Sequence, residues 1–309
     1  MKHELAIAHR VCAVPSKNAA GFSDKFEMVK RNARSLFDAL RGIRTRIFVL
    51  LDGCPDGYER FFRDLAQDFP DIEMDVERAD HAGNHATFAW QLSVLADRTD
   101  APFVYLSEDD YIYRPGAFRA MLEVLRQPWA DFVTPLDHPD RYNRSTVEPA
   151  RTELRVAGDC HWRRAPTTCL TFLAKREAFL GSLARLRAYS DGAEDSVVWL
   201  GITKEGLFSP SVLSRSVAAL FRRVLLRRSV WYGHLLPLMA WAKHNVRLFF
   251  TPRFSLWSPV PSLAVHCCST SVPPDCGWIS GRIPEADAAA LLAAGEKYLR
   301  EGRDAPTGD

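Results

Sequence analysis

Hydrophobic and polar positions along the first hundred residues follow two different periods. Short apolar runs bounded by turn residues predict strands, and apolar residues spaced three and four apart predict amphipathic helices. The expected strands are 4–14, 46–54, 72–79 and 103–107, and the expected helices between them are 23–40, 57–69 and 84–98. Such alternation is typical of a mainly parallel sheet covered by helices. The sequence therefore predicts the α/β fold class.

The pattern is less regular in the remainder of the chain. We expect a strand running into a loop at 132–143, a strand at 168–173 followed by a helix, and a helix after the acidic loop at 190–195. A final amphipathic helix is expected at 285–299. No apolar run approaches the ~20 residues that span a bilayer. No apolar run follows the basic start either, so we expect no signal peptide.

Three acids, Glu108, Asp109 and Asp110, directly follow the expected strand 103–107. Like charges repel, and each costs several kcal/mol if it is buried without a partner. A bound Mg²⁺ or Mn²⁺ would remove this cost, because both ions prefer oxygen ligands. In parallel sheets, ligands bind beyond the carboxyl ends of the strands, where Asp52 is also expected. A solvated turn that caps the next helix is the alternative interpretation.

Composition is that of an ordinary globular protein of 309 residues, with 47% hydrophobic and 25% charged residues. Seven cysteines without framework spacing indicate reduced thiols in a cytoplasmic protein. The net charge is only +2, but no Asp or Glu lies between Gly206 and Thr270. That stretch holds eight basic residues: Arg215, Arg222, Arg223, Arg227, Arg228, Lys243, Arg247 and Arg253. This asymmetry predicts one face suited to an anionic surface.

The basic stretch also has the pattern of an amphipathic helix. Val217, Leu220, Phe221 and Val224 share one helical face, and the opposite face carries Arg215, Arg222 and Arg223. Three aromatics, Trp231, Tyr232 and Trp241, are of the kind that settles at lipid headgroups. We therefore expect peripheral binding to an anionic membrane, on its cytoplasmic face. A core helix with a solvated basic face, at a dimer contact, is the alternative; no recognition motif supports nucleic-acid binding.

Four segments together resemble glycosyltransferases of the GT-A fold, near the glycosyltransferase family 2-like group. They are "LLDGCPDG" at 50–57, "GNHATFAWQL" at 83–92, "YLSEDDY" at 105–111 and "GAEDSVVW" at 192–199. The resemblance covers about residues 5–205 and returns at 265–278. It implies a Rossmann-like sheet that binds a nucleotide-sugar donor. The acidic motif has Glu at its first place instead of Asp, and no QxxRW-type motif is present, so a polymerase is not expected.

The resemblance also implies roles for single residues. Asp110 and Glu108 would hold Mn²⁺ or Mg²⁺, with His266 completing the set of metal ligands. Asp109 would meet the donor sugar or ribose. The donor nucleotide would lie along Asp52, Gly83 and Asn84. The alternatives are local: a Pro-Asp-Gly turn after Asp52, and an ordinary helix start with Asn84 as its cap.

On the acceptor side, the resemblance implies that Asp195 is the general base of an inverting transfer, with Glu194 beside it. Capping of the following helix is the alternative for these acids. Trp162 could stack on an acceptor sugar, and Arg163 could meet a phosphate. Packing or solvent exposure is equally compatible with both. A zinc site at His266, Cys267, Cys268 and Cys276 is a further alternative, although the spacing matches no standard pattern.

We therefore predict a metal-dependent glycosyltransferase with a glycan or lipid-linked acceptor, acting in cell-surface polysaccharide or glycolipid synthesis. The expected divisions are a catalytic domain at 1–205, a membrane-associating segment at 206–258, and a return to the active site with a terminal helix at 259–309. A nucleotidyltransferase of related fold is one alternative function, but the glycine-rich basic start after its first strand is missing. A non-catalytic, membrane-associated protein that binds nucleotide-sugars is the other.

Overall fold

The protein is described here as a computed structural model of residues 2–14, 22, 24–143, 153–225, 232–268 and 270–304. The strands are β1 (Leu5–Cys12), β2 (Thr45–Asp52), β3 (Ile72–Ala79), β4 (Phe103–Ser107), β5 (Tyr111–Tyr113), β6 (Phe132–Val133), β7 (Leu154–Ala157), β8 (Cys160–Arg164), β9 (Phe172–Lys175), β10 (Leu256–Val260) and β11 (Ala264–His266). The α-helices are α1 (Lys25–Ala39), α2 (Asp56–Gln67), α3 (Gly83–Asp97), α4 (Ala117–Leu125), α5 (Asp140–Asn143), α6 (Arg176–Ser190), α7 (Asp195–Thr203), α8 (Pro210–Val224), α9 (Leu236–His244), α10 (Arg247–Phe250) and α11 (Glu285–Asp304). Two short 3₁₀ helices are η1 (Tyr232–Leu235) and η2 (Gly277–Ile279).

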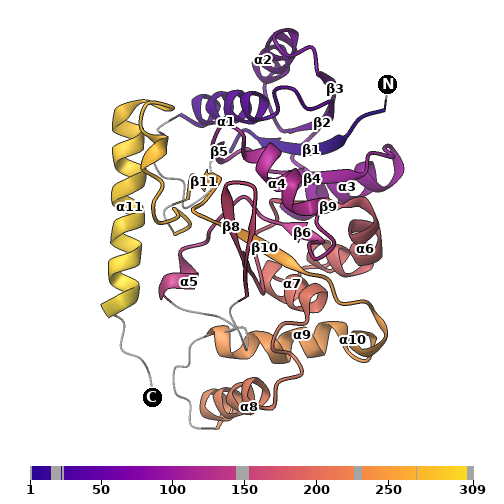
Figure 1. The fold of residues 1–309 in the computed structure, drawn as a ribbon, viewed down its shortest axis with the longest axis vertical. Coiled ribbons are helices and arrows are strands. Elements are labelled where there is room, and N and C mark those ends of the chain that lie inside the picture. Colours follow the sequence, from indigo (N-terminus) through magenta and orange to yellow (C-terminus); the bar gives the residue numbers. More distant parts are fainter. Residues whose placement is uncertain are drawn as a thin grey trace.

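Nine strands form one mixed sheet in the order β3-β2-β1-β4-β9-β6-β10-β8-β7 (Figure 1). The neighbours from β3 to β4 run parallel, as the alternation of strand and helix predicts. Beyond β4 the sheet changes character, because β9 is antiparallel to both of its neighbours. The β6–β10 pair is parallel, and β8 and β7 complete the sheet in antiparallel pairings. The α/β class is confirmed, with a mixed sheet.

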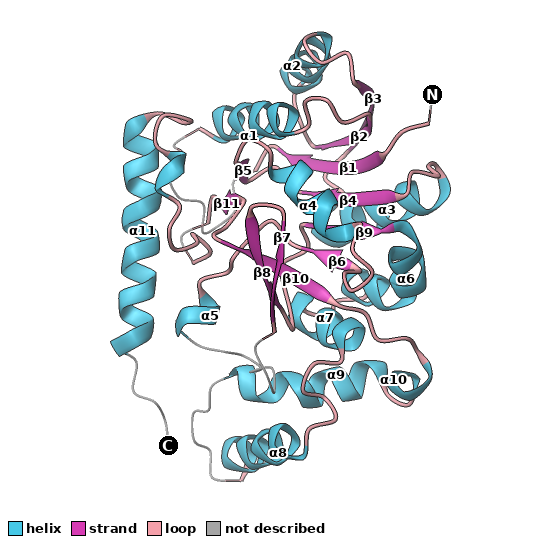
Figure 2. Ribbon diagram, in the orientation of Figure 1, coloured by secondary structure: helices cyan, strands magenta, loops and turns pink. Residues whose placement is uncertain are grey.

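Strand β1 explains why helices cover both faces of this sheet. Its side chains alternate between two apolar cores: Leu5 and Ile7 belong to one, and Ala6 and Ala8 to the other. The first core is closed by α1, α2 and α4, and the second by α3, α6 and α7. A strand that is buried on both faces requires a helix layer on each side. The arrangement of the layers is visible in Figure 2.

The C-terminal third extends this core in two directions. Helices α8, α9 and α10 form a layer beyond α7, with a small apolar core that includes Val197, Leu200 and Leu236 (Figure 1). Strand β10 then returns to the large sheet between β6 and β8. Strand β11 pairs with β5 in a separate two-stranded sheet. None of the helices in the described ranges is long and apolar enough to cross a bilayer.

Three local predictions differ from the structure. The strand expected at 168–173 is β9, which starts only at Phe172, because the residues that pair with β4 are 172–175. Asn84 is not the cap of α3, since the helix already begins at Gly83. Strand β10 was not expected, because Pro259 lies within it. The expected domain boundaries remain predictions, although β10 crosses the boundary proposed at residue 258.

Candidate active site

The parallel strands bring the candidate residues to one edge of the sheet. Cys12 of β1 is in register with Asp52 of β2, and His9 of β1 with Ser107 of β4. The three acids of the sequence motif directly follow Ser107. Chain segments from β1, β2 and β4 therefore converge at the carboxyl ends of the strands, the edge at which α/β sheets bind ligands.

Each of the three acids has its own cationic partner. The pairs are Glu108 with Arg10, Asp109 with Lys25 at 2.7 Å, and Asp110 with His266 at 3.1 Å. These partners come from β1, α1 and β11, which are far apart in the sequence. Protein cations therefore offset the repulsion that the sequence suggested a metal ion would relieve.

Glu108 and Asp109 are fully engaged by protein groups. One oxygen of Glu108 accepts from Arg10, and the other accepts from the Thr171 hydroxyl at 2.8 Å. Asp109 accepts from the Lys25 ammonium and from the backbone N–H of Cys12 at 2.8 Å. Burial raises the pKa of Asp109, and the charge of Lys25 opposes this shift. The two carboxylates point to different partners and do not converge on one point.

Asp110 and His266 form a different kind of pair. Strand β11 brings His266 opposite Tyr111, and the two rings stack with centroids 4.5 Å apart. One oxygen of Asp110 lies 3.1 Å from Nε2 of His266, whereas the other is buried without a hydrogen-bond partner. Burial raises the pKa of Asp110, but the charge and hydrogen bond of His266, together with the charges of Lys25 and Arg10, lower it to about 2. Burial lowers the pKa of His266, and Asp110 raises it well above its usual range.

The fit of a metal ion rests on this pair. Among the residues that the structure describes, no group of three or more His, Cys, Asp or Glu side chains is arranged to hold an ion. This includes the alternative zinc group, because Cys267, Cys268 and Cys276 are buried free thiols outside any such group. The unpartnered oxygen of Asp110 and the imidazole of His266 fit as two ligands. Mg²⁺ is often held by only one or two side chains together with water and substrate phosphates.

Asp52 organises the start of α3. Its two carboxylate oxygens accept from the backbone N–H groups of Ala82 and Gly83, at 2.7 and 2.9 Å. A helix leaves these amides without intrahelical partners. Asp52, at the end of β2, therefore caps the start of α3. Gly83 has φ +83°, which favours glycine at this position. A Cβ there would meet no atom within 4 Å, so space remains beside this backbone.

Arg10 is the main site residue that the sequence analysis missed. Its guanidinium donates to the backbone oxygen of Asn84 at 2.9 Å and also to the side chains of Asn84 and Glu108. Asn84 in turn donates to the Tyr189 hydroxyl at 2.5 Å. Arg10 thereby connects the predicted nucleotide segment to the acidic motif. The available signal was a basic residue inside the apolar run "LAIAHRVC", where an arginine needs an acidic partner.

Asp195 lies at the start of α7, and Glu194 occupies the cap position before it. One oxygen of Asp195 accepts from the backbone N–H of Ser196 at 2.6 Å. Burial raises the pKa of Asp195 to about 6; hydrogen bonds from Ser196 oppose the shift, and the charges of Glu108 and Glu194 add to it. Glu194 is exposed, so burial distinguishes the two acids of the motif.

The half-buried Cys169 lies close to both parts of the site. Burial raises its pKa, the hydrogen bond and charge of His266 lower it, and the charges of Asp195 and Glu108 raise it. The indole N–H of Trp199 on α7 donates to the backbone oxygen of Cys169 at 3.2 Å, and two residues farther on the Thr171 hydroxyl donates to Glu108 at 2.8 Å. Residues 169–171 thus connect α7, which begins at Asp195, to the acidic motif.

The two predicted acceptor residues have structural roles in β8. Trp162 is fully buried, and its indole N–H donates to the backbone oxygen of Ala157 at 3.3 Å. A ring with no exposed face cannot stack on an acceptor sugar, so the prediction for Trp162 is wrong. Arg163 forms an ion pair with the buried Asp137 and lies over the Tyr142 ring. Its role in binding a phosphate stays a prediction.

Comparison with known proteins gives structural similarity only. No family model and no curated protein matches the chain. Among solved structures, the mannosyltransferase PcManGT from Pyrobaculum calidifontis, in complex with GDP-Man and Mn²⁺, is 13% identical with a TM-score of 0.43, over 98% of this chain and 84% of that one. The glycosyltransferase GlyE of Streptococcus pneumoniae is 12% identical with a TM-score of 0.40, over 97% and 62%. 4-Diphosphocytidyl-2C-methyl-D-erythritol synthase from Anaerococcus prevotii is 10% identical with a TM-score of 0.34, over 62% and 80%.

The chain is thus similar in structure, over nearly its full length, to glycosyltransferases of the GT-A type. All of these TM-scores lie below 0.5, so the likeness carries no argument about the chemistry of the site.

Proposed function

We propose that the chain is a GT-A glycosyltransferase that transfers a sugar from a nucleotide-sugar to an acceptor hydroxyl with inversion. The observation that carries this proposal is that residues 169–171 join the helix that begins at Asp195 to the acidic motif, which also holds the Asp110–His266 pair. Such a transfer needs a base for the acceptor proton and a positive environment for the leaving diphosphate. The geometry supports both requirements at the carboxyl edge of the sheet.

Asp195 supplies the base. A carboxylate with a pKa of about 6 is mostly ionised at neutral pH and yet holds a proton better than an ordinary aspartate. It takes the proton from the acceptor hydroxyl while that oxygen attacks the anomeric carbon. The bond from this carbon to the diphosphate breaks with its electron pair going to the phosphate. Attack from the face opposite the leaving group inverts the configuration.

Asp110 and His266 would hold the divalent cation. When it is bound, Mn²⁺ or Mg²⁺ supplies charge neutralisation for the leaving diphosphate. Asp110 would offer its unpartnered oxygen, and His266 would offer its imidazole in the neutral form. Glu108 acts from farther away: it holds Arg10, which in turn holds the backbone of Asn84 beside the proposed donor site.

The donor nucleotide is proposed to lie along Asp52, Gly83 and Asn84, with Asp109 near its ribose or sugar. Space beside the backbone of Gly83 supports this position. Asp52 contributes indirectly, because both of its oxygens already fix the start of α3. The acceptor is proposed to be a glycan or a lipid-linked molecule.

Calorimetry with UDP-, GDP-, dTDP- and CMP-sugars, each with and without Mn²⁺, tests the proposal. We expect one donor class to bind the wild-type protein with an affinity that depends on Mn²⁺. Asp110→Asn should abolish this dependence, because it removes a charged ligand. Asp64→Asn, a change of an exposed acid on α2, is the matched control and should bind as wild type. Unchanged Mn²⁺-linked affinity in Asp110→Asn would remove the metal site from the proposal.

A further inference from the structure

Helix α8 turns its larger apolar side chains outward and its smaller ones inward. The residues that it buries are Val212, Ser216 and Ala219. Its exposed apolar residues are larger and share another face: Leu213, Val217, Leu220, Phe221, Val224 and Leu225, with exposed fractions of 40% to 64%. Surface helices normally direct such residues to the core. This face has no covering element in the part of the chain that the structure describes.

A second group of exposed apolar residues lies just before α8 and around α10. Phe208, just before α8, lies 5.3 Å from Trp241 and 5.5 Å from Phe249 between ring centroids. Phe250 is 86% exposed, and Phe208, Val246 and Phe249 are each at least half exposed. We call these four residues and the exposed apolar face of α8 the apolar platform. Exposed apolar surface of this extent marks an interaction site.

The structure modifies the prediction for the aromatic residues of this segment. Trp241 is half-buried, and its indole N–H donates to the backbone oxygen of Leu207 at 3.1 Å. Its ring packs against Phe208 and Phe249 and so supports the platform. Phe249 and Phe250 take the exposed positions instead. Trp231, the side chain of Tyr232, Arg227 and Arg228 lie outside the described residues.

Charge complementarity favours one occupant for the platform. The sequence has no Asp or Glu from Gly206 to Pro274. Exposed basic residues on or beside the platform helices are Arg215, Arg222, Arg223, Lys243 and Arg247. On the α8 wheel, Arg215 and Arg222 lie seven residues apart and therefore share one side of the helix. Positive charge beside exposed apolar rings matches an anionic lipid surface better than it matches a second copy carrying the same charges.

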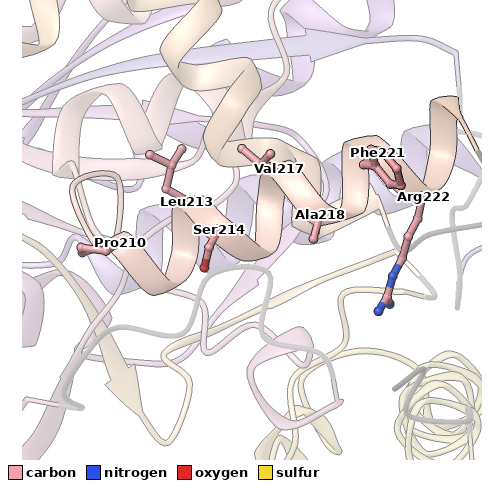
Figure 3. A pocket seen from close by; sticks show the side chains of 7 residues that line it. All are labelled: Pro210, Leu213, Ser214, Val217, Ala218, Phe221 and Arg222. Carbon is pink, nitrogen blue, oxygen red and sulfur yellow. The ribbon is translucent and has the colours of Figure 1, made fainter.

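An open hollow on the surface of α8 also combines apolar and basic side chains. Its volume is about 690 Å³, and it is lined by Pro210, Leu213, Ser214, Val217, Ala218, Phe221 and Arg222 (Figure 3). The lining is largely apolar, and Arg222 lies at one end of the row of side chains. An acyl chain with an anionic headgroup has this distribution of apolar and charged parts.

We propose that the apolar platform is a binding surface for an anionic lipid bilayer. The contact lies at the interface, with the side chains of α8 and α10 inserted among headgroups and upper acyl chains. Helix α9 joins this surface to α7, the helix that begins at Asp195, through the core of Val197, Leu200 and Leu236. Membrane binding therefore holds the candidate site at a fixed height above the lipid. The proposal rests on surface chemistry and does not require glycosyl transfer.

Vesicle flotation of the full chain tests the proposal. Vesicles of phosphatidylcholine with one quarter phosphatidylglycerol are compared with pure phosphatidylcholine, at 50 mM and at 500 mM NaCl. We expect at least tenfold stronger binding to the anionic vesicles at low salt, and a loss of that difference at high salt, because ions screen the headgroup charge. Absence of binding to anionic vesicles overturns the proposal.

Two matched double variants test whether vesicle binding depends on the platform or on any exposed apolar residue. Val217→Ser with Phe221→Ser should lower binding at least tenfold while keeping the wild-type thermal unfolding curve, since both side chains are exposed. Leu154→Ser with Val156→Ser changes two apolar residues of β7 that are 59% and 66% exposed, and should bind as wild type. Equal loss in both variants contradicts a specific platform.

Light scattering after size-exclusion chromatography addresses the rival occupant. A monomer at micromolar concentration supports the lipid assignment. A dimer that the Val217→Ser, Phe221→Ser variant dissociates, without any effect on vesicle binding, would assign the platform to a second copy and overturn the proposal.

Discussion

At the scale of single residues, Arg10 has the widest influence on the candidate site. It lies in a strand whose neighbouring residues are nearly all buried, yet it contacts both Glu108 and Asn84. A buried charge has lost its hydration, and only its interaction with an opposite charge offsets that cost. Removing one partner therefore destabilises the fold. The Arg10–Glu108 ion pair can therefore be tested by its effect on protein stability, without measuring activity.

We expect Arg10→Met to lower the free energy of unfolding by about 3–5 kcal/mol, because it leaves Glu108 without its counter-charge. Urea denaturation measures this loss. The double variant Arg10→Met with Glu108→Gln should recover a large part of it, since neither charge then remains. If the double variant is as unstable as the sum of both single variants, the two side chains do not act as a pair.

Asp195→Asn should lower turnover by roughly 10²–10⁴-fold while donor affinity stays nearly unchanged, because only the acceptor step needs the base. In the wild type, kcat/KM should rise with pH and level off above an apparent pKa of about 6. The variant should lose this dependence. Asp191→Asn, an exposed acid in the preceding loop, serves as the control and should retain the profile. A rise near pH 6 that persists in Asp195→Asn would assign the base to another group.

The same pKa shift has a consequence for stability that does not depend on activity. The folded-state pKa of Asp195 is higher than the ordinary value of 3.8, so the folded protein binds this proton more tightly than the unfolded chain. Ionising Asp195 therefore costs stability as pH rises from about 4 to 6, and the full cost persists above this window. Asp195→Asn should raise Tm relative to wild type at pH 8, with a much smaller difference at pH 4.

At the scale of elements, the sequence predicts what local patterning determines and misses what depends on distant partners. Strands β3 and β4 match their predicted bounds, because apolar runs ended by polar residues fix them locally. The capping group of α3 could not be predicted, since Asp52 caps the helix from a strand 30 residues earlier. Strand β10 was hidden by Pro259, a residue that cannot donate to a ladder and that argues against a central strand.

Site residues follow the same division. The acids after β4 and the acids before α7 could be identified from short motifs in the sequence. The resemblance also pointed to His266 beside Asp110. Arg10 and Lys25 could not be identified as partners, because only the packing of β1 and α1 brings them to the acids. Trp162 was misassigned because a loop and a central strand with an inward-facing ring have similar local composition.

Asp52→Ala should destabilise the protein by about 1–2 kcal/mol, the cost of losing a capping carboxylate at a helix start. The loss should be local, so hydrogen exchange should increase in the first turn of α3 more than in β2. Asn84→Ala is the comparison at the position that the sequence suggested as the cap. It leaves the amides of Ala82 and Gly83 bound to Asp52, so exchange at those two amides should stay slow. Faster exchange there in Asn84→Ala than in Asp52→Ala would contradict the assignment of Asp52 as the cap.

At the scale of the whole molecule, the fold joins the sheet that positions the candidate active site to a helical layer that bears the apolar platform. The connection runs through α7 and α9. Nε2 of His244 on α9 lies 3.1 Å from the backbone oxygen of Val197 on α7, and its ring lies against Gly201. Lys204 reaches from the end of α7 to the backbone oxygens of Leu248 and Thr251. These contacts fix the positions of α8 and α10 relative to α7. A change at the α7–α9 contact should therefore displace the entire layer.

Gly201→Ala tests whether this contact holds the layer to the sheet. A Cβ at Gly201 would lie 2.3 Å from Nε2 of His244, so the ring must move or α9 must shift away from α7. Overpacking of this kind costs about 1–3 kcal/mol. We expect a lower free energy of unfolding in urea, together with faster limited proteolysis within residues 206–250, because a displaced α9 no longer protects that layer. The double variant Gly201→Ala with His244→Ala restores the space, so it should be more stable than Gly201→Ala alone and more resistant to the protease. Cleavage that is equally slow in wild type and Gly201→Ala would mean that other contacts hold the layer, and the rigid coupling between the platform and Asp195 would lose its support.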